Sequence, residues 1–535
     1  MRRIVIIFLL FITIDGHAQL NAQYSLFTDC DIYISGETIL FNLFTPEEAQ
    51  PGIAKLDLIN SGGKIIMEIN KKIINHQVDG YIHLPDSLST GTYLLCTSEK
   101  DHKKLFIKEL LICNRFKGLT ESLPVLRSSS LPPSIEIQAS VGIEGLENKY
   151  KTRDKVHAKI HLSPEVRSKL KDDLFVAAIE KIPGYDSHGF VKDLTRKPNK
   201  NTTNEGVTVD GWAVDPATGK AFNNGCIMLS VPDSVPGLRY FITQDDGYFN
   251  FQLNNYYGNI PIVVQGFDPD KKRLLKLTLN HNDSLPVALT VFDKQSINED
   301  LRKLIADKIE AAILCKIFNY QEVIPAHAPL KMNKEYPFYG IPTEVVRPGL
   351  FIDLPDFTEI SRELLPGVKF RAFNRIPTLQ ILNPATLNYY AGQPLLLLDG
   401  IPVQDLNVIK NLGSKEINRI DICRRERYFG DLYFPGVVAI YSKDHEYNRI
   451  AESEDLIKQQ IETIQPQDSL NTTINHVANE PDLRKVLLWN CALPSEETIS
   501  VDFNTSDIRG TYQLIVRGQT TDGTLVYKNQ VFEVN

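Results

Sequence analysis

Short stretches of alternating apolar and polar residues, separated by turn residues, fill residues 24–114 of the chain. Ile39 and Phe41 fall on one face of a strand that begins just after the turn residue Gly36. Further strands, each bounded by Gly, Pro, Ser or Asp, are expected at 54–60, 64–70, 80–84 and 91–97. The pattern predicts a β-sandwich over residues 24–114.

The same alternation recurs in later segments. A second sandwich is expected over 134–182, where the strand after Tyr150 echoes the first domain. Residues 183–206 are polar and rich in turn residues, which predicts a linker. A third sandwich is expected over 207–292. The C-terminal β-sandwich unit, 481–535, has too few short strands for a core of its own, so we expect it to borrow strands from another sandwich or to pack upon one.

Helical spacing marks one long segment, residues 293–325, which we expect to form a helical connector. Its apolar positions are Leu301, Leu304, Ile305, Ile309, Ile313 and Ile317. Ser296, with Glu299 three residues later, is expected to cap this helix. The apolar face predicts that the helix docks on a neighbouring domain.

Residues 345–445 combine helix and strand patterns, which predicts an α+β domain. Asp356 and Glu359 are expected to start its first helix, and Pro366 to end it. Buried strands follow, in which Leu396, Leu398, Ile420 and Val438 are expected to share one sheet. Residues 446–480 are polar and predict a linker, with a helix over 450–464 as the alternative. The predicted fold class is therefore mainly β, with tandem small sandwiches, one helical connector and one α+β domain.

The bulk composition is that of an ordinary globular chain, with 42% hydrophobic residues in 535. This length is too great for one core and predicts several domains. A net charge of -8 argues against a nucleic-acid partner. After the N-terminus no apolar run approaches the length of about 18 residues that a membrane helix needs, so no direct membrane span is expected.

The N-terminus has the three parts of a secretory signal peptide. Arg2 and Arg3 precede an apolar run over 4–14, and Gly16-His17-Ala18 supplies small residues for cleavage. We therefore expect residues 1–18 to be a signal peptide and the mature protein to be exported; an uncleaved anchor is the alternative.

The sequence lacks the common motifs for catalysis and metal binding. There is no H-E-x-x-H, G-x-S-x-G, P-loop or Rossmann glycine pattern, so we expect no enzyme and no cofactor. The seven cysteines have no zinc spacing, and the turn at Asp245 and Asp246 has too few ligands for Ca²⁺, so no metal site is expected. A disulfide among Cys30, Cys96 and Cys113 and a role as small buried hydrophobes remain alternatives.

Two sets of motifs resemble known β domains. Tyr33-x-x-Gly-Glu-x-Ile-x-Phe41, with Gly80 to Tyr93 further on, resembles the macroglobulin-like domains of bacterial envelope proteins. The ordered motifs Val207 to Asp215, Thr218-Gly219, Gly225 to Ser230 and Thr243 to Phe251 resemble the carboxypeptidase-regulatory-like fold. In the second family such a domain often precedes the plug of a TonB-dependent receptor.

Residues 394–443 resemble the second half of that plug domain. A helix that ends in Pro366-Gly367-Val opens such a module and extends the resemblance over about 350–445, so 345–445 is expected to be a plug-like domain. A buried strand runs into Asp399-Gly400, a short helix follows, and two strands end near Ser442-Lys443. In the family a large transmembrane barrel follows, whereas here only about 90 residues remain, so no transmembrane barrel is expected. The usual Arg-Gly pair of the first half and a convincing TonB box are missing, which puts coupling to TonB in doubt.

These resemblances imply a non-enzymatic interaction or scaffold protein of the cell envelope, in the periplasm or associated with the outer membrane, including its surface. Its expected partners are other envelope proteins, among them an outer-membrane β-barrel. The alternative is an accessory plug or cap subunit of a TonB-dependent transport system, and a hydrolase with an unrecognised site is a third reading. Tyr428, Phe429, Tyr433 and Phe434 are the candidate partner-docking residues, because loops rarely need so many aromatics and interfaces favour them. The alternative is that these rings cover the domain's own core.

One short pattern resembles the Asp-Ser/Thr-apolar acceptor for O-glycosylation of envelope proteins. It occurs four times, which makes Ser87, Ser234, Ser284 and Ser469 candidate O-glycosylation sites. Ordinary Asp-Ser turns are the alternative.

The signal peptide makes a direct prediction. The mature chain should begin near Gln19 and fractionate outside the cytoplasm, because the signal peptidase removes the preceding segment. Intact mass of the exported chain measures this, and a retained Met1 would contradict it.

Overall fold

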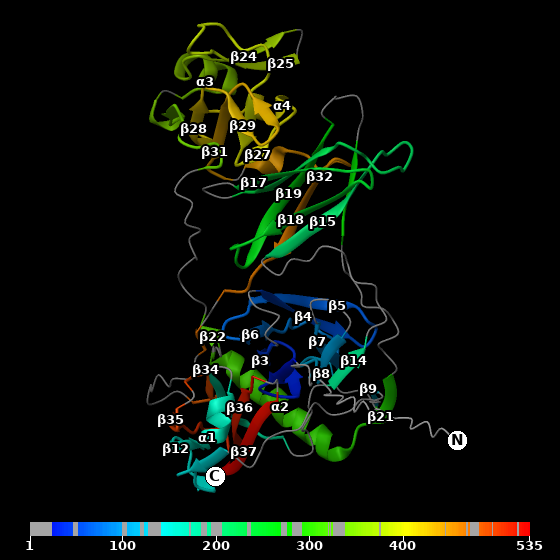
Figure 1. Ribbon diagram of the computed structural model, residues 1–535, viewed down its shortest axis with the longest axis vertical. Coiled ribbons are helices and arrows are strands. Elements are labelled where there is room, and N and C mark those ends of the chain that lie inside the picture. Colours follow the sequence, from blue (N-terminus) through cyan, green and yellow to red (C-terminus); the bar gives the residue numbers. More distant parts are fainter. Residues whose placement is uncertain are drawn as a thin grey trace, which may run out of the picture.

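The computed structural model describes residues 24–45, 52–98, 104–117, 122–126, 141–170, 173–182, 190–193, 206–232, 237–268, 275–280, 292–318, 320, 323–324, 337–351, 353–373, 376–444, 446–466, 469–470, 481–494, 496–521 and 524–535. The predicted signal peptide lies outside these residues. The structure is mainly β, as predicted, and Figure 1 shows two groups of sheets, one above the other. Two sandwiches and the long helix form the lower group, and a third sandwich and an α+β module form the upper one.

The N-terminal sandwich closes over Ile39 and Phe41, which are fully buried as the alternation predicted. Its first sheet has the order β1 (Ser25–Thr28), β3 (Thr38–Phe44), β6 (Gln77–His83). Its second sheet has the order β14 (Phe190–Asp193), β8 (Lys104–Cys113), β7 (Gly91–Ser98), β4 (Ile53–Asn60), β5 (Ile65–Lys72), and β2 (Ile32–Ile34) pairs with β8. Residues 190–193 were predicted to be linker. They form a strand instead, because the open edge of β8 offers backbone partners.

The second sandwich is built from two distant parts of the chain, and we call it the split sandwich. One sheet has the order β10 (Val141–Glu144), β12 (Lys155–Leu162), β35 (Thr498–Asn504). The other has the order β11 (Lys149–Tyr150), β37 (Leu525–Val534), β36 (Gly510–Gln519), β13 (Leu174–Glu180), β34 (Val486–Leu493). The short helix α1 (Pro164–Lys169) follows β12. The C-terminal unit therefore supplies half of this sandwich and has no separate core.

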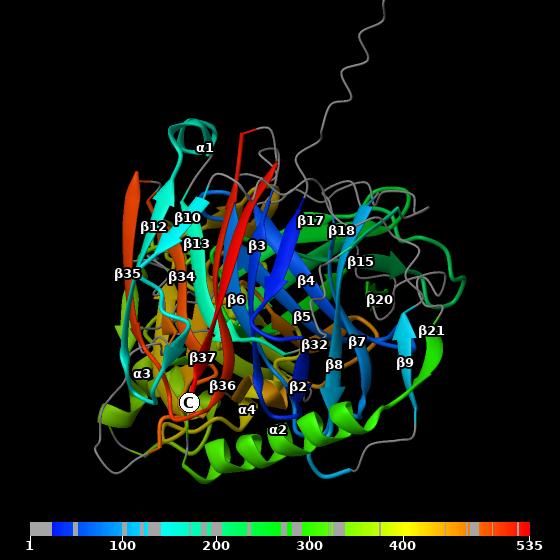
Figure 2. The ribbon, with the colours of Figure 1, turned by 90° about the horizontal axis from the view of Figure 1, so that it is seen from below.

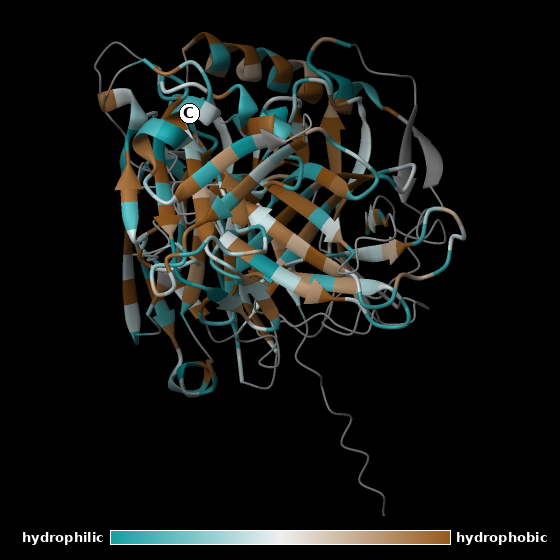
Figure 3. Cartoon of the chain, turned by 90° about the horizontal axis from the view of Figure 1, so that it is seen from above, coloured by the Kyte–Doolittle hydropathy of each residue, from teal (hydrophilic) through white to brown (hydrophobic). Residues whose placement is uncertain are grey.

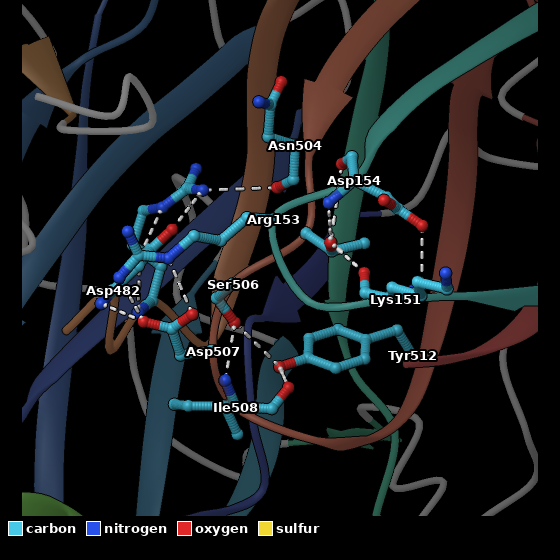
Figure 4. A network of polar contacts seen from close by, with 11 residues as sticks. Lys151, Arg153, Asp154, Asp482, Asn504, Ser506, Asp507, Ile508 and Tyr512 are labelled. Carbon is cyan, nitrogen blue, oxygen red and sulfur yellow. Dashed lines mark hydrogen bonds and ion pairs between the residues drawn. The ribbon is translucent and has the colours of Figure 1, made fainter. Parts of the chain in front are cut away.

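Polar contacts hold the two parts of the split sandwich together at one end (Figure 4). The Arg153 guanidinium donates through Nε and Nη2 to both carboxylate oxygens of Asp507, at 2.8 and 2.6 Å, across 354 residues of chain. Asp507 also accepts from the backbone N–H of Asp482, whose carboxylate pairs with Arg484 at 2.9 and 2.7 Å. Tyr512 closes the corner by donating to the carbonyl of Ile508.

The third sandwich, which we call the middle sandwich, has two sheets. One has the order β18 (Tyr248–Leu253), β15 (Val207–Val214), β20 (Lys276–Leu279). The other has the order β17 (Gly237–Ile242), β16 (Cys226–Val231), β19 (Asn259–Phe267), β32 (Leu456–Glu462). The prediction of a linker over 446–480, or of a helix over 450–464, is therefore wrong for β32. The open edge of β19 supplies seven antiparallel partners, and Ile457 and Ile461 pack on the core.

The α+β module contains one five-stranded sheet in the order β23 (Glu344–Val346), β28 (Ile417–Cys423), β31 (Val437–Ser442), β26 (Leu395–Leu398), β27 (Ile401–Pro402). Helices α3 (Phe357–Leu364) and α4 (Asn407–Lys410), the 3-10 turns η3 (Pro348–Leu350) and η4 (Glu446–Arg449), and the hairpins β24 (Val368–Phe373)–β25 (Ile376–Ile381) and β29 (Arg427–Phe429)–β30 (Leu432–Phe434) surround it. Asp356 caps α3 by accepting from the N–H of Glu359, as predicted. Leu396, Leu398, Ile420 and Val438 share the sheet and its core, also as predicted.

The long helix α2 (Glu299–Ile317) lies against the N-terminal sandwich, as predicted (Figure 2). Of its predicted apolar face, Leu301, Leu304, Ile305 and Ile309 make this contact, whereas Ile313 and Ile317 are exposed, so the prediction is wrong for the last turns. Its cap is Asn298, whose side chain accepts from the N–H of Leu301, and the prediction of Ser296 is wrong. Ser296 belongs to the strand β21 (Phe292–Ser296), which pairs with β9 (Ser122–Leu126). A further strand pair joins β22 (Val323–Ile324) to β33 (Ser469–Leu470).

The N-terminal and split sandwiches pack face to face through an apolar layer that includes Phe44, Phe175 and Trp489. Figure 2 shows β36 and β37 beside β3 and β6, and in Figure 3 the hydrophobic residues gather on strands inside the molecule. One cation lies in this layer. The Arg517 side chain is buried between the rings of Phe27 and Phe44, at 4.8 and 5.3 Å from the ring centroids. Separating the two sandwiches would expose these apolar side chains to water, so the layer stabilises their contact.

Two further predictions concern disulfides and membrane-spanning helices. Cys96 and Cys113 are buried, and within the described part of the chain neither they nor Cys30 form a disulfide, which favours the reading as small buried side chains. Among the described helices, none is both long and apolar enough to cross a membrane.

The buried pair at the corner of the split sandwich predicts a stability effect. Arg484→Met should lower the free energy of unfolding by about 3–5 kcal/mol, because it leaves the buried carboxylate of Asp482 without its cation. Chemical denaturation measures the loss. Arg153→Met is the matched control, because its pair with Asp507 is about one third exposed; its loss should be smaller and should shrink further in salt. Equal losses in both variants would contradict this ranking.

The core of the α+β module predicts a second effect. Leu398→Ala should lower the free energy of unfolding by about 2–5 kcal/mol, because this fully buried side chain would leave a cavity next to Ile440. Thermal or chemical denaturation measures it. The exposed Leu387 is the control, and its replacement by Ala should change stability little. Unchanged stability of Leu398→Ala would show that the sheet is not packed as described.

Candidate functional site

The four candidate docking residues lie on the hairpin β29–β30, which we call the aromatic hairpin. A Gly430-Asp431 turn connects its strands, and Gly430 has φ +59°, which suits a two-residue hairpin turn with glycine first. The register pairs Tyr428 with Tyr433. Because side chains alternate along a strand, the two tyrosines share one face and Phe429 and Phe434 lie on the other.

The inner face of the aromatic hairpin belongs to the core of the α+β module. Phe429 and Phe434 pack on a buried cluster that includes Tyr339, Leu397 and Val437. The ring of Phe429 also lies 5.0 Å from that of Phe338. Phe429 and Phe434 therefore cover the module's own core, which was the alternative to a docking role.

The outer face presents two tyrosine rings to solvent. Tyr428 is 66% exposed and Tyr433 48%, and their ring centroids lie 5.3 Å apart. Both hydroxyls donate to the carboxylate of Glu426, at 3.4 Å from Tyr428 and 3.1 Å from Tyr433. Partial desolvation and the hydrogen bond to Glu426 raise the pKa of Tyr433. Glu426 therefore holds the hydroxyl ends of both rings, while about half or more of each side chain stays exposed.

Contacts with the rest of the protein fix the position of the aromatic hairpin. The N–H of Asp431 donates to the hydroxyl of Tyr240 on β17 of the middle sandwich, at 3.3 Å. A side chain at Gly430 would collide with that hydroxyl, so glycine is needed here for space as well as for its positive φ. At the base, the Arg427 guanidinium donates to the carbonyl of Tyr339 at 3.0 Å. The outer tyrosines are thus held by two domains, which lowers the entropy cost of a contact made through them.

The candidate glycosylation sites are placed only in part. Ser87 is exposed in the turn that follows β6, next to Asp86. Asp86 is paired there with Arg115 at 2.7 Å and with Lys316 of α2 at 3.3 Å. Ser469 belongs to β33. Ser234 and Ser284 lie outside the described residues, and glycosylation of all four stays a prediction.

The described residues contain no group of three or more His, Cys, Asp or Glu side chains that could hold a metal ion. At the acidic turn considered for Ca²⁺, Asp245 accepts from the Asn223 amide at 2.6 Å and Asp246 from the N–H of Tyr248 at 3.1 Å. These are ordinary turn contacts.

Two residues of the aromatic hairpin site were not predicted from the sequence. Glu426 lies in a run of arginines and gave no sign that it would accept from two tyrosines. Tyr240 is 191 residues away from its partner in the chain. One signal was available, because Gly-Asp between short apolar stretches predicts a hairpin, and the pairing of Tyr428 with Tyr433 then follows from the turn.

Comparison with known proteins gives limited similarity. No family model and no curated protein matches the chain. Among solved structures, it aligns over 96% of its length with Salmonella α2-macroglobulin reacted with methylamine, at 10% identity, 23% coverage of that chain and a TM-score of 0.16. The trypsin-activated and elastase-activated forms from Escherichia coli both align at 10% identity over 96% of this chain, with 42% and 43% of their own length covered and TM-scores of 0.23. The chain thus spans less than half the length of these proteins, and TM-scores this low assign neither a fold nor a function to it.

Proposed function

We propose that the chain is a non-enzymatic interaction protein of the bacterial cell envelope, which docks on another envelope protein through the outer face of its aromatic hairpin. The observation that carries the proposal is the pair Tyr428 and Tyr433, two large exposed rings held in place by Glu426. Tyrosine is enriched at interfaces because it offers a large contact area for little conformational entropy.

The architecture supports a scaffold role. A binding face is most effective when its frame is rigid, since ordering the frame on binding would cost affinity. Here the module that carries the aromatic hairpin shares its core cluster with Val263 of β19 and Leu456 of β32, both in the middle sandwich. The amide of Gln265, also on β19, donates to the carbonyl of Pro402 at 3.0 Å. The sandwiches thus serve as rigid supports for the docking face, and the signal peptide and envelope location belong to the same proposal.

The test compares the two faces of the aromatic hairpin. Replacing Tyr428 and Tyr433 together by Ala should weaken capture of the envelope partner about tenfold or more, because each ring is expected to contribute over 1 kcal/mol at the interface. The melting temperature should stay nearly unchanged, because both rings are exposed. Cross-linking and co-purification from detergent-solubilised envelopes measure capture.

The matched control replaces Phe429 and Phe434 by Ala. These rings pack on the core, so this variant should lower the melting temperature and lose capture only in proportion to the unfolded fraction. Unchanged capture by the tyrosine variant would contradict the proposal. Capture of a TonB-dependent barrel by the wild-type chain would favour the alternative, an accessory subunit of a transport system.

A further inference from the structure

Three carboxyl and two amino side chains meet where the N-terminal sandwich, the split sandwich and α2 come together, and we call this place the ionic junction. Asp29 and Glu37 flank β2, Glu180 ends β13, Lys485 precedes β34, and Lys308 comes from the middle of α2. They line a cavity of 10 Å³, which is room for about one water. Figure 2 shows α2 passing below β2 at this place.

Both cations of the ionic junction already have a carboxylate partner. The ammonium of Lys308, whose side chain is 5% exposed, lies 3.0 Å from Glu180. The ammonium of Lys485 pairs with Glu37. Three carboxylates therefore face two ammonium groups, and both ammonium groups are engaged by carboxylates other than Asp29.

Asp29 is the third carboxylate, and its hydrogen-bond donors are neutral. One of its oxygens, Oδ1, accepts from the Tyr33 hydroxyl and from the N–H of Leu40, both at 2.7 Å. Within the described residues no ammonium or guanidinium group forms an ion pair with Asp29, and the residue is 8% exposed. Ionised, it would leave the ionic junction with one uncompensated negative charge away from water, whereas protonated it leaves the junction neutral.

Three other groups near Asp29, the Cys30 thiol, the Tyr33 hydroxyl and the Lys308 ammonium, keep one charge state across the acid range. Burial raises the pKa of the Cys30 thiol to about 11, and burial raises the pKa of Tyr33 well above its ordinary value, so both stay neutral. Burial alone would lower the pKa of Lys308, but the carboxylate of Glu180 at 3.0 Å opposes this and the pKa is raised above its ordinary value, so the ammonium stays charged. Nearby, Asp31 is paired with Lys108 of β8 at 2.6 Å. Burial, reinforced by Glu37 and opposed by the bonds from Tyr33 and Leu40, raises the pKa of Asp29 from 3.8 to about 7.

We propose that the ionic junction is a proton-operated clamp. With Asp29 neutral, it holds α2 and the C-terminal half of the split sandwich on the N-terminal sandwich, and loss of the proton loosens this contact. The consequence for a scaffold is that its modules are held most firmly in acid and become easier to separate near neutral pH.

The direction follows from proton linkage. Opening the clamp hydrates Asp29 and returns its pKa to the ordinary value of 3.8, so opening releases a proton at any pH between that value and about 7. The opened fraction should therefore rise with pH by up to about tenfold per unit in this window and level off above it. Below the window both states hold the proton, and the dependence disappears.

Hydrogen exchange on the full-length protein tests the clamp. In the wild type, protection of the backbone amides of α2, corrected for the intrinsic exchange rate, should fall by up to about tenfold per unit between about pH 5 and pH 7. Asp29→Asn keeps an acceptor for Tyr33 and Leu40 but cannot ionise, so its protection should stay level. Asp57→Asn is the matched control, because burial raises the pKa of Asp57 to about 6 but this residue lies on β4, two strands from β8. It should keep the wild-type dependence in α2.

Two outcomes would overturn the proposal: the same pH dependence in Asp29→Asn as in the wild type, or no dependence in the wild type. If Asp29→Asn fails to fold, Tyr33→Phe decides. It removes a donor that lowers the pKa of Asp29, so the upper end of the window should move to higher pH. A window that stays in place, or one that moves to lower pH, would assign the dependence to another group.

Discussion

The pairing of β13 with β34 and β36 is the constraint on which the rest of the structure depends, because it joins the first third of the chain to its last 50 residues. Closing a loop of about 300 residues costs about 5 kcal/mol of chain entropy, and this cost grows only slowly with length. A core shared by both halves, which includes Val176, Phe503 and Tyr512, offsets it. The N–H of Glu180 also donates to the carbonyl of Lys485, so the insertion leaves and returns at adjacent points. A long insertion is tolerated under that condition.

The polar segment that follows the α+β module joins three domains in succession. Tyr447 and Ile450 pack on the core of the module, and β32 then completes a sheet of the middle sandwich. Next, the N–H of Gln465 donates to the carbonyl of Asn70 on β5 of the N-terminal sandwich. Such a segment fixes the positions of the three domains relative to one another, because it makes backbone or core contacts with each of them. The ionic junction lies at the other side of the N-terminal sandwich, where the proposed clamp adds a pH-dependent contact to the apolar packing of α2 and the split sandwich.

The candidate site shows how far residue patterns reach. The aromatic run at 428–434 could be identified from the sequence, because loops rarely need so many aromatic residues and protein interfaces favour them. Which rings face outward depends on the register of β29 and β30, and this register follows from the Gly430-Asp431 turn. The roles of Glu426 and Tyr240 depend on contacts between parts of the chain that no local pattern relates. The same is true of Asp29, whose burial arises only when three distant segments meet.

Local patterns in the sequence determined the mainly β class, the faces of strands such as Ile39 to Phe41, and the start of α3 at Asp356, because strand alternation and helix capping act within a few residues. Tertiary structure decided the rest. Residues 456–462 have apolar positions that also fit a helix, yet they form β32 because the edge of β19 was open. Asn298 caps α2 in place of Ser296, because Ser296 belongs to a strand that pairs with β9. The split of the second sandwich could not be read locally, since strand pairing at long range depends on which edges and apolar faces remain uncovered once the nearer strands have paired.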